Sequence, residues 1–359
     1  MVLNVLNSNI SMVDINKTYI TIVPKTNNPT KMTKFRLISL SNVIYKLISK
    51  VLANRLKLIL PQIIIENQSA FLFERLIIDN VLITFELMHY LDHKRDGKDC
   101  YMAIKLDMSK AYDRVEGDFI EQVMKKLGFH EKWICLIMRC ITTVSYSVLI
   151  NGVTYGNIIP LRGLCQGDPL SSYLFLLCAN GFFSLINRVV RNQTMSGLSI
   201  CRDCPTITHL FFADNSLLFC KANSQECQQL VEILHLYEVA LGKKINIDKS
   251  SIFFSANTEE KKKNETLNFL GPMQDSRHSK YPGLPSIIGR SRNDVFAEIK
   301  ERVGRKLSRW KEKNLSIGGR EILIKAVAQA IPTYTISCFQ LPKGLCDEIE
   351  GMMLRFWWG

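Results

Sequence analysis

The amino-acid sequence predicts an α+β fold divided into two or three subdomains. A chain of 359 residues is long enough for two or three subdomains of roughly 150 residues each. Hydrophobic residues make up 47% of the chain, which is enough for a sizeable core and excludes a disordered protein. Short β-type runs with turn signals between them alternate with longer runs whose apolar residues recur at helical spacing.

Several of the predicted strands come in hairpins. Residues 144–150 and 153–159 flank Asn151-Gly152, a pair typical of a primed two-residue turn. Residues 206–212 and 216–220 flank the polar pair Asp214-Asn215 in the same way. Two further strands are expected at 20–23 and 101–106.

Helices are predicted between these strands. The first long one begins at Ser41 or Asn42, both good N-caps, and ends near residue 60, where Pro61 follows. A polar, mostly basic stripe along it is interpreted as a solvated face. Further helices are predicted at residues 79–93, 119–127, 133–140, 170–190 and 225–241. Gly242 is expected to cap the C-terminus of the last of them.

The charge balance indicates a polyanionic partner. Lys and Arg number 46 against 33 Asp and Glu, a net charge of +13, which favours nucleic acid over a membrane and excludes an acidic solvating protein. Residues 290–325 hold eleven cations and five acids, a balance suited to a lobe that grips a phosphate backbone. An ordinary exposed helical surface is the alternative. The candidate nucleic-acid-binding residues here are Arg305, Lys306, Arg309, Lys311, Arg320 and Lys325.

The cysteines and the N-terminal residues indicate the cellular compartment of the protein. The eleven cysteines have mostly apolar neighbours and no regular spacing, so we expect reduced, mostly buried thiols without a disulfide partner, in the cytosol or nucleus. Residues 1–15 have no basic region of the kind that begins a signal peptide. The most apolar stretch, 173–186, is shorter than the ~20 residues of a membrane span. No membrane association is therefore expected.

Two acidic residues follow apolar strands more than a hundred residues apart. Asp107 follows 101–106, and Asp214 follows the apolar run ending in LFFA. A carboxylate exposed at a strand end is well placed to bind a metal, and two neighbouring strands aim both at one point. Hard Mg²⁺ ions prefer carboxylate oxygens, and nucleotidyl transfer uses two such ions ~3.5–4 Å apart. Strand-end acids that bind nothing are also common, so spacing alone leaves both interpretations open.

A series of sequence blocks spans nearly all of the chain. The series includes KFRLISLSNVIYKLISKVLANRLK at 34–57, NQSAF at 67–71, IKLDMSKAYDRV at 104–115, RGLCQGDPLSSYLF at 162–175, HLFFADNSLLFCKA at 209–222, GKKINIDKSSIFFS at 242–255 and LSIGGREILIKAVAQAIPTY at 315–334. In these blocks, and in their order, the chain resembles the reverse transcriptase domain of plant LINE-type (non-LTR) retrotransposons.

This resemblance implies a right-hand polymerase fold with fingers, a palm that holds an antiparallel sheet, and a helical thumb. Fingers and palm would occupy residues 1–271. The palm-to-thumb junction and the basic thumb would occupy 272–359. Asp107 and Asp214 match the family's catalytic aspartates, which would bind two Mg²⁺ ions. RNA template, DNA primer and dNTPs are the partners that the resemblance implies.

The same resemblance implies roles for residues around the nucleotide. Arg36 matches a residue that clamps the triphosphate, where a planar bidentate donor suits phosphate oxygens. Tyr112 matches the aromatic gate that excludes a ribose 2′-hydroxyl, and Gln166 with Gly167 matches a loop against the incoming nucleotide. Lys249 lies in the segment whose lysine protonates the pyrophosphate.

One departure from the family pattern concerns the catalytic box itself. The residue after Asp214 is Asn215, where the family has a second aspartate. Asparagine keeps a coordinating oxygen but loses a negative charge beside two dications, which should weaken metal binding. We therefore expect weak or no polymerase activity. The alternatives are a non-catalytic nucleic-acid-binding relic and an intron-maturase-like splicing protein; the blocks GGREILIKAVAQAIPTY and FWWG argue against the last.

Overall fold

The computed structural model describes residues 2–7, 11–109, 111–213, 215–242, 244–275, 281, 283–285, 287–288, 292–311 and 315–359. The chain divides into two compact units, one of residues 1–75 with 94–275 and the other of residues 76–93 with 276–359. The break after residue 275 lies close to the predicted boundary at 271. The grouping of 76–93 with the C-terminal helices was not expected, and the division into fingers, palm and thumb stays a prediction.

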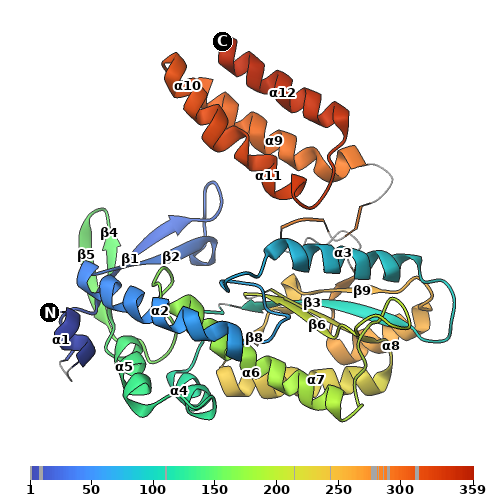
Figure 1. The fold of residues 1–359 in the computed structure, drawn as a ribbon, viewed down its shortest axis with the longest axis horizontal. Coiled ribbons are helices and arrows are strands. Elements are labelled where there is room, and N and C mark those ends of the chain that lie inside the picture. The colour runs from blue at the N-terminus through green and yellow to red at the C-terminus, as the bar shows by residue number, and fades with distance from the viewer. Residues whose placement is uncertain are drawn as a thin grey trace. The chain divides into compact units, whose positions relative to one another are not determined.

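The first unit holds a four-stranded sheet, which corresponds to the expected fingers. Its strands are β1 (Lys17–Pro24), β2 (Phe35–Ser41), β4 (Ser145–Ile150) and β5 (Val153–Ile158), in the order β2-β1-β4-β5. β1 pairs antiparallel with β2 and parallel with β4. The predicted primed turn is confirmed, since Asn151 and Gly152 both have positive φ. The nearby helices are α1 (Val2–Asn7), α2 (Val43–Ile63), α4 (Gly117–Lys126) and α5 (Glu131–Thr142) (Figure 1).

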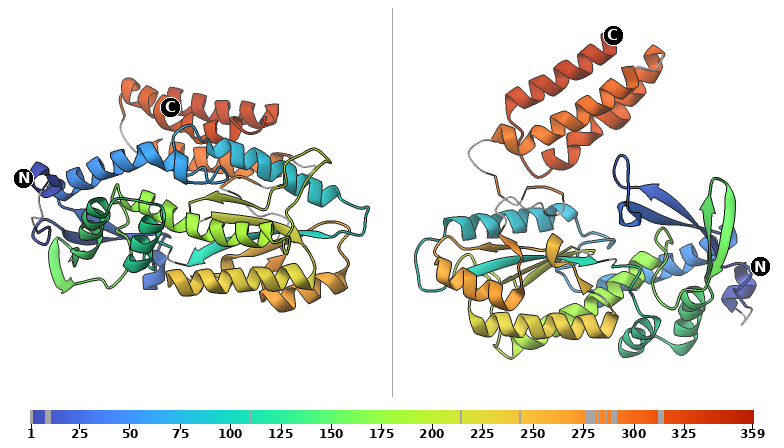
Figure 2. Two further views of the ribbon diagram at one scale, coloured as in Figure 1. Left: turned by 60° about the horizontal axis from the view of Figure 1, so that its bottom comes forward. Right: turned by 180° about the vertical axis from the view of Figure 1, so that it is seen from behind.

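A second sheet in the same unit forms the expected palm. Its central strand β3 (Tyr101–Ser109) pairs antiparallel with β7 (Asn215–Lys221), β8 (Lys244–Ile245) and β9 (Ser251–Phe254). β6 (His209–Phe212) continues the sheet beyond β7, and β10 (Gln274–Asp275) pairs parallel with β9. α6 (Ser171–Arg191) and α7 (Ser224–Leu241) lie along one face (Figures 1 and 2), and α8 (Glu260–Leu270) packs on α7. The predicted α+β class and mainly antiparallel palm are confirmed.

Helix α6 confirms the helix predicted at 170–190, and its apolar character extends beyond the stretch 173–186 named in the sequence analysis. It has 21 residues, and its length and composition are those of a helix able to cross a membrane. However, 44% of its most apolar 18-residue stretch is buried inside the protein. Nine residues of this helix, among them Leu174, Phe175 and Phe182, are buried. A core helix passes the same test of length and hydropathy, and the packing of α6 against α2, α4 and α7 identifies it as one.

The end of α2 corrects the prediction that Pro61 would stop the helix. Pro61 lies inside α2, which continues to Ile63. The proline ring removes one backbone donor, but the Ile64 amide still donates to the Leu60 carbonyl. Arg75 also donates to carbonyls of this helix end, including that of Ile64 at 3.0 Å. A basic side chain at a helix C-terminus satisfies carbonyls that have no helical partner.

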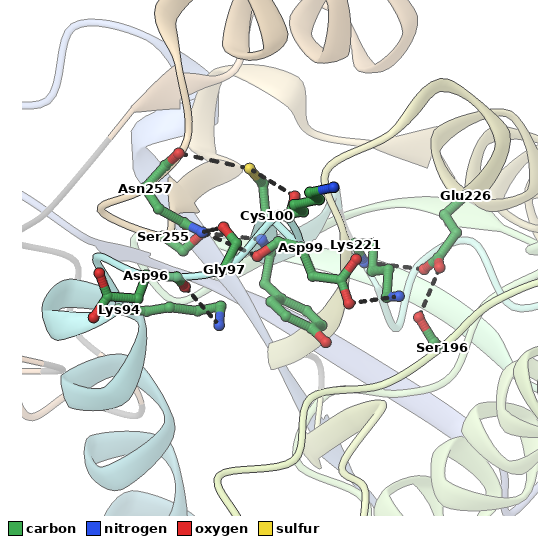
Figure 3. Close-up of polar contacts among 12 residues, drawn as sticks. Lys94, Asp96, Gly97, Asp99, Cys100, Ser196, Lys221, Glu226, Ser255 and Asn257 are labelled. Carbon is green, nitrogen blue, oxygen red and sulfur yellow. Dashed lines mark hydrogen bonds and ion pairs between the residues drawn. The ribbon is translucent and has the colours of Figure 1, made fainter.

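Polar contacts fix the register of β3 at the end where the strand begins (Figure 3). Asp99 forms an ion pair with Lys221 of β7 at 3.1 Å, and the Asn257 amide donates to the carbonyls of Gly97 and Asp99. The buried Glu226 accepts from the Lys221 amide. A slip of one residue would turn every β3 side chain to the opposite face, so these contacts help to determine which residues of β3 face the site.

One pair of cysteines contradicts the expectation of free thiols. Cys201 and Cys204 form a disulfide, with Cα atoms 5.2 Å apart. Two cysteines separated by two residues in a turn reach the Cα spacing that a disulfide needs. The other nine cysteines are free thiols, and six of them are buried, as expected.

The second unit is helical in its described part. It contains α3 (Ile77–His93), α9 (Arg292–Lys311), α10 (Ile317–Leu323), a π-helical turn at Ile324–Ala328, α11 (Ala330–Ile336) and α12 (Lys343–Trp358). The α9 and α12 helices pack together, and the Trp310 ring lies 5.9 Å from that of Phe356 between centroids. This unit corresponds to the expected helical thumb.

The buried histidine in β6 predicts a pH dependence of stability. His209 is 1% exposed, and burial lowers its pKa from 6.5 to about 4. Between these pH values the unfolded chain binds a proton that the folded chain does not. The free energy of unfolding should therefore fall as the pH drops from about 6.5 towards 4, by up to about 3 kcal/mol.

Urea unfolding of the wild type and of His209→Gln at pH 7, 5.5 and 4.5 measures this effect. The wild type should lose more stability than the variant over this range, because glutamine does not titrate. Equal losses in the two proteins would show that other groups cause the acid sensitivity.

Candidate active site

The two central palm strands bring Asp107 and Asn215 together. They are directly opposite each other in the antiparallel pairing of β3 with β7, and both are half-buried. Opposite residues of an antiparallel pair project to the same face with Cβ atoms about 4.5–5.5 Å apart. A carboxylate and a carboxamide therefore face the same side of the sheet. The predicted partner Asp214 lies outside the described residues, between Ala213 and Asn215 in the chain.

Asp107 has a cationic neighbour on its own strand. Lys105 is two residues away and therefore on the same face of β3. Burial lowers the pKa of the Lys105 ammonium, and the nearby Asp107 carboxylate partly opposes that shift. A positive charge thus lies beside the predicted metal ligand.

The segment after β8 holds the backbone of Asp107 in place. The Ser250 hydroxyl accepts from the Asp107 amide at 3.2 Å, and the Asn246 amide donates to the Asp107 carbonyl at 2.9 Å. Lys249, the predicted proton donor, lies between these two residues in the 3₁₀ turn Ile247–Lys249 and is exposed. The fold therefore brings the segment that carries Lys249 to the backbone of Asp107.

The glycine-containing loop at 162–168 lies against the turn that follows β3. The Leu164 amide donates to the Tyr112 carbonyl at 2.9 Å, and the Gly163 amide donates to the Val115 carbonyl at 2.8 Å. A Cβ on Gly163 would lie 2.8 Å from the Asp113 carbonyl oxygen, so only glycine permits this approach. The Tyr112 ring stacks on Phe175 of α6, with centroids 4.7 Å apart.

The same loop reaches the fingers sheet at its edge strand. The Gln166 carbonyl accepts from the Ser39 amide of β2 at 3.1 Å, and Gly167 adopts a positive φ beside Ser39. Arg36 lies on the same strand and is exposed. A continuous set of backbone contacts therefore connects Tyr112, through the loop, to the strand that carries Arg36.

Two buried side chains that the sequence analysis did not single out hold this loop. Asp168 accepts hydrogen bonds from the hydroxyls of Ser49 and Ser171, and its burial raises the pKa of the carboxyl group. Cys165 contacts the Tyr146 hydroxyl at 3.0 Å, and burial raises the pKa of its thiol to about 11. Asp168 lies within a block that resembles the family, but its partner Ser49 is 119 residues away and leaves no local signal.

A third such residue, Gln68, contacts the turn that carries Asp214. Its side-chain oxygen accepts from the Ala213 amide at 3.3 Å. The residue is 1% exposed and comes from the NQSAF block. No sequence pattern connects it with a residue 145 positions later.

The basic residues predicted to bind nucleic acid fall into two groups. Four of them, Arg305, Lys306, Arg309 and Lys311, are exposed on α9. The other two make contacts within the protein. Arg320 donates to the Trp357 carbonyl at 2.9 Å, and Lys325 is 2.6 Å from the Glu321 carboxylate.

The donors at the palm fit a hard divalent cation in part. Mg²⁺ is typically held by one or two carboxylates together with substrate phosphates and water, and Asp107 with the Asn215 side-chain oxygen offers two oxygen donors on one face. Within the described ranges, no group of three or more His, Cys, Asp or Glu residues gathers closely enough to bind a metal. Complete coordination therefore depends on ligands beyond these two.

The two sheets, the loop between them and the Asp107–Asn215 pair are those of a polymerase palm with its fingers. A family model described as "Reverse transcriptase (RNA-dependent DNA polymerase)" matches residues 23–273. The chain belongs to this family, whose members use divalent metal ions.

Two of the related proteins are named as products of transposable elements. The chain is 25% identical over 352 residues to "Transposon TX1 uncharacterized 149 kDa protein" of Xenopus laevis, covering 94% of this chain and 25% of that protein. It is 28% identical over 229 residues to "Retrovirus-related Pol polyprotein from type-2 retrotransposable element R2DM" of Drosophila melanogaster, covering 63% and 20%. The chain thus spans a quarter or less of the length of these relatives. It is a reverse transcriptase domain of the non-LTR retrotransposon type.

Solved structures of telomerase are also similar. The telomerase of Candida tropicalis in complex with a fragment of telomeric RNA is 14% identical, with a TM-score of 0.49, and the match covers 90% of this chain and 54% of that one.

Proposed function

We propose that this chain carries out RNA-templated DNA synthesis from dNTPs with two Mg²⁺ ions, at a rate reduced by Asn215. The observation that carries the proposal is the position of Asp107 directly opposite Asn215 on paired palm strands. Short matches to Arabidopsis thaliana proteins, one of them 37% identical over 76 residues, support a plant source.

The chain's own residues have distinct tasks in this reaction. Asp107 and Asp214 hold the ions, and Arg36 at the fingers edge binds the triphosphate. Tyr112, fixed by its stacking on Phe175, borders the sugar of the incoming nucleotide. Lys249 supplies a proton to the leaving group. Magnesium ions held by Asp107 and Asp214 would supply activation of the primer 3′-hydroxyl and stabilisation of the leaving pyrophosphate.

The thumb side of the proposal rests on α9. Its buried residues Phe296, Ile299, Val303 and Leu307 form the core-facing side. At 100° per residue, Arg305 and Arg309 lie about 40° apart on the side away from the core, and Lys306 lies on the flank of the helix between them and Ile299. A helix that presents several cations along one side suits the phosphate backbone of a template–primer duplex.

A second candidate function is nucleic-acid binding without catalysis. Asn215 favours this function, because it should weaken metal binding and hence catalysis. The exposed cations of α9 can still bind nucleic acid, since they do not depend on the catalytic box. The two candidates share the binding step and differ only in the incorporation of nucleotides.

One experiment tests both functions on the same protein. Binding of an RNA–DNA template–primer is measured as a function of salt, and extension is measured with labelled dNTPs. Replacing Arg305, Lys306 and Arg309 together by glutamine should weaken binding at least tenfold and lower the salt slope by roughly 0.9 for each phosphate that is no longer neutralised. The matched control replaces Lys261, Lys262 and Lys263 of α8 by glutamine and should leave binding unchanged.

Extension that disappears in Asp107→Ala supports the polymerase. Salt-sensitive binding without extension in any variant supports the binding function instead. Equal loss of binding in the α9 and α8 variants would refute the proposed role of α9.

A further inference from the structure

We propose that Gln68 is a positioning residue that holds the catalytic turn in the geometry needed for metal binding. This inference rests on the proposed function, since it concerns the turn that carries Asp214. Gln68 itself touches neither nucleotide nor metal; it acts through the backbone of Ala213.

The turn between β6 and β7 has little freedom. Phe212 pairs with Asn215 across the hairpin, so the chain has only two residues in which to connect the strands. Ala213 adopts a φ of +53°, a left-handed conformation that costs an L-residue about 1–2 kcal/mol. An interaction that is made only in this conformation must offset that cost.

Gln68 supplies such an interaction. Its side-chain oxygen accepts from the Ala213 amide at 3.3 Å and from the Ala70 amide at 3.0 Å. Two backbone N–H groups converge on one atom, so the oxygen rather than the nitrogen of the side chain faces them. The Gln68 side-chain nitrogen is buried without a hydrogen-bond partner among the described residues, which shows that the side chain is arranged for the oxygen contacts.

The backbone around Gln68 is itself tied to β6. The Phe211 amide donates to the Asn67 carbonyl at 2.9 Å, and the Ser69 amide donates to the Phe211 carbonyl at 3.3 Å. On the other side, Arg75 donates to the Gln68 carbonyl at 2.8 Å and to carbonyls at the end of α2. Gln68 is thus a fixed point between the fingers helix α2 and the catalytic turn.

The test compares three variants of the whole chain. Gln68→Met keeps the length of the side chain and removes the acceptor, whereas Gln68→Glu keeps an acceptor for both amides. Asn16→Leu is the matched control, because Asn16 is also a fully buried amide, bonded to the Cys140 carbonyl and the Thr143 hydroxyl beside the fingers sheet. Its loss costs a similar buried hydrogen bond away from the catalytic turn.

Hydrogen exchange reports the position of the turn without any metal. Gln68→Met should raise exchange of the Ala213 amide roughly tenfold or more, while Gln68→Glu and Asn16→Leu should leave it close to the wild-type rate. Unchanged exchange in Gln68→Met, or equal acceleration in Asn16→Leu, would overturn the inference.

Mn²⁺ binding, followed by the electron paramagnetic resonance signal of the free ion, reports the consequence. Binding that depends on Asp107 should weaken about tenfold in Gln68→Met and be retained in Gln68→Glu. If exchange responds but even the wild type shows no binding that depends on Asp107, the proposed function fails and the positioning role stands. If the wild type binds Mn²⁺ and Gln68→Met binds it equally well, the inference fails and the proposed function stands.

Discussion

Replacing Asn215 by aspartate is expected to raise the rate of primer extension by roughly tenfold or more over a wild type that extends little or not at all. The substitution restores the second carboxylate of the predicted catalytic box, directly across the sheet from Asp107, where it would attract the Mg²⁺ ions. A negative and a positive unit charge 4 Å apart, such as a carboxylate and a metal cation, attract each other by about 4 kcal/mol at the effective dielectric constant of a protein surface. A tenfold change in rate needs only about 1.4 kcal/mol, so the electrostatic gain suffices.

The measurement is the initial rate of dTTP incorporation on a poly(rA)/oligo(dT) substrate. Asn223→Asp is the matched control, because it makes the same change of charge at the N-cap of α7, where aspartate and asparagine cap equally well. Adding Asp107→Ala to the Asn215→Asp variant should abolish incorporation. Strong extension by the wild type, or no gain in Asn215→Asp, would show that the asparagine does not limit the rate.

Replacing Gly163 by alanine should destabilise the protein by about 2–6 kcal/mol and weaken nucleotide binding. The new Cβ would lie 2.8 Å from the Asp113 carbonyl oxygen, at a φ of +102°. The obstacle is backbone, so the loop must move, and strain and clash each contribute about 1–3 kcal/mol. The hydrogen bonds from Gly163 and Leu164 to the Tyr112 turn would break with that movement.

Gly152→Ala separates the close approach from the backbone strain. Gly152 also has a positive φ, and a Cβ there would meet nothing within 4 Å. Chemical denaturation should show a loss of only about 1 kcal/mol for this variant, and the Kd for dNTPs should rise in Gly163→Ala alone. Equal destabilisation of the two variants would mean that the approach to Asp113 does not constrain the loop.

The secondary structure was largely predictable because its signals are local. The Asn151-Gly152 turn, the Asn42 cap of α2 and the Gly242 cap of α7 each depend on a few neighbouring residues, and the structure confirms all three. The end of α2 was missed because Arg75, which donates to its last carbonyls, lies outside the helix. The Cys201–Cys204 bond was missed because composition argued for reduced thiols throughout the chain.

The candidate site was predictable only where a single residue type matched a motif. Asp107 lies on β3 directly opposite Asn215 of β7, whereas the position of Asp214 and the catalytic roles of both aspartates stay predictions. Gln68 and Asp168 lie in recognised blocks, yet their roles come from partners 145 and 119 residues away. Hydrogen bonds over such separations leave no periodicity or spacing in the sequence.

The parallel pairing of β1 with β4 has a consequence for biosynthesis. Lys17 pairs with Ser145, so the inner edge of β1 stays open until more than a hundred further residues have left the ribosome. At synthesis rates of about 5–20 residues per second, this interval is on the order of ten seconds. An open strand edge promotes aggregation, so chains that are released before residue 145 should be the insoluble products of expression.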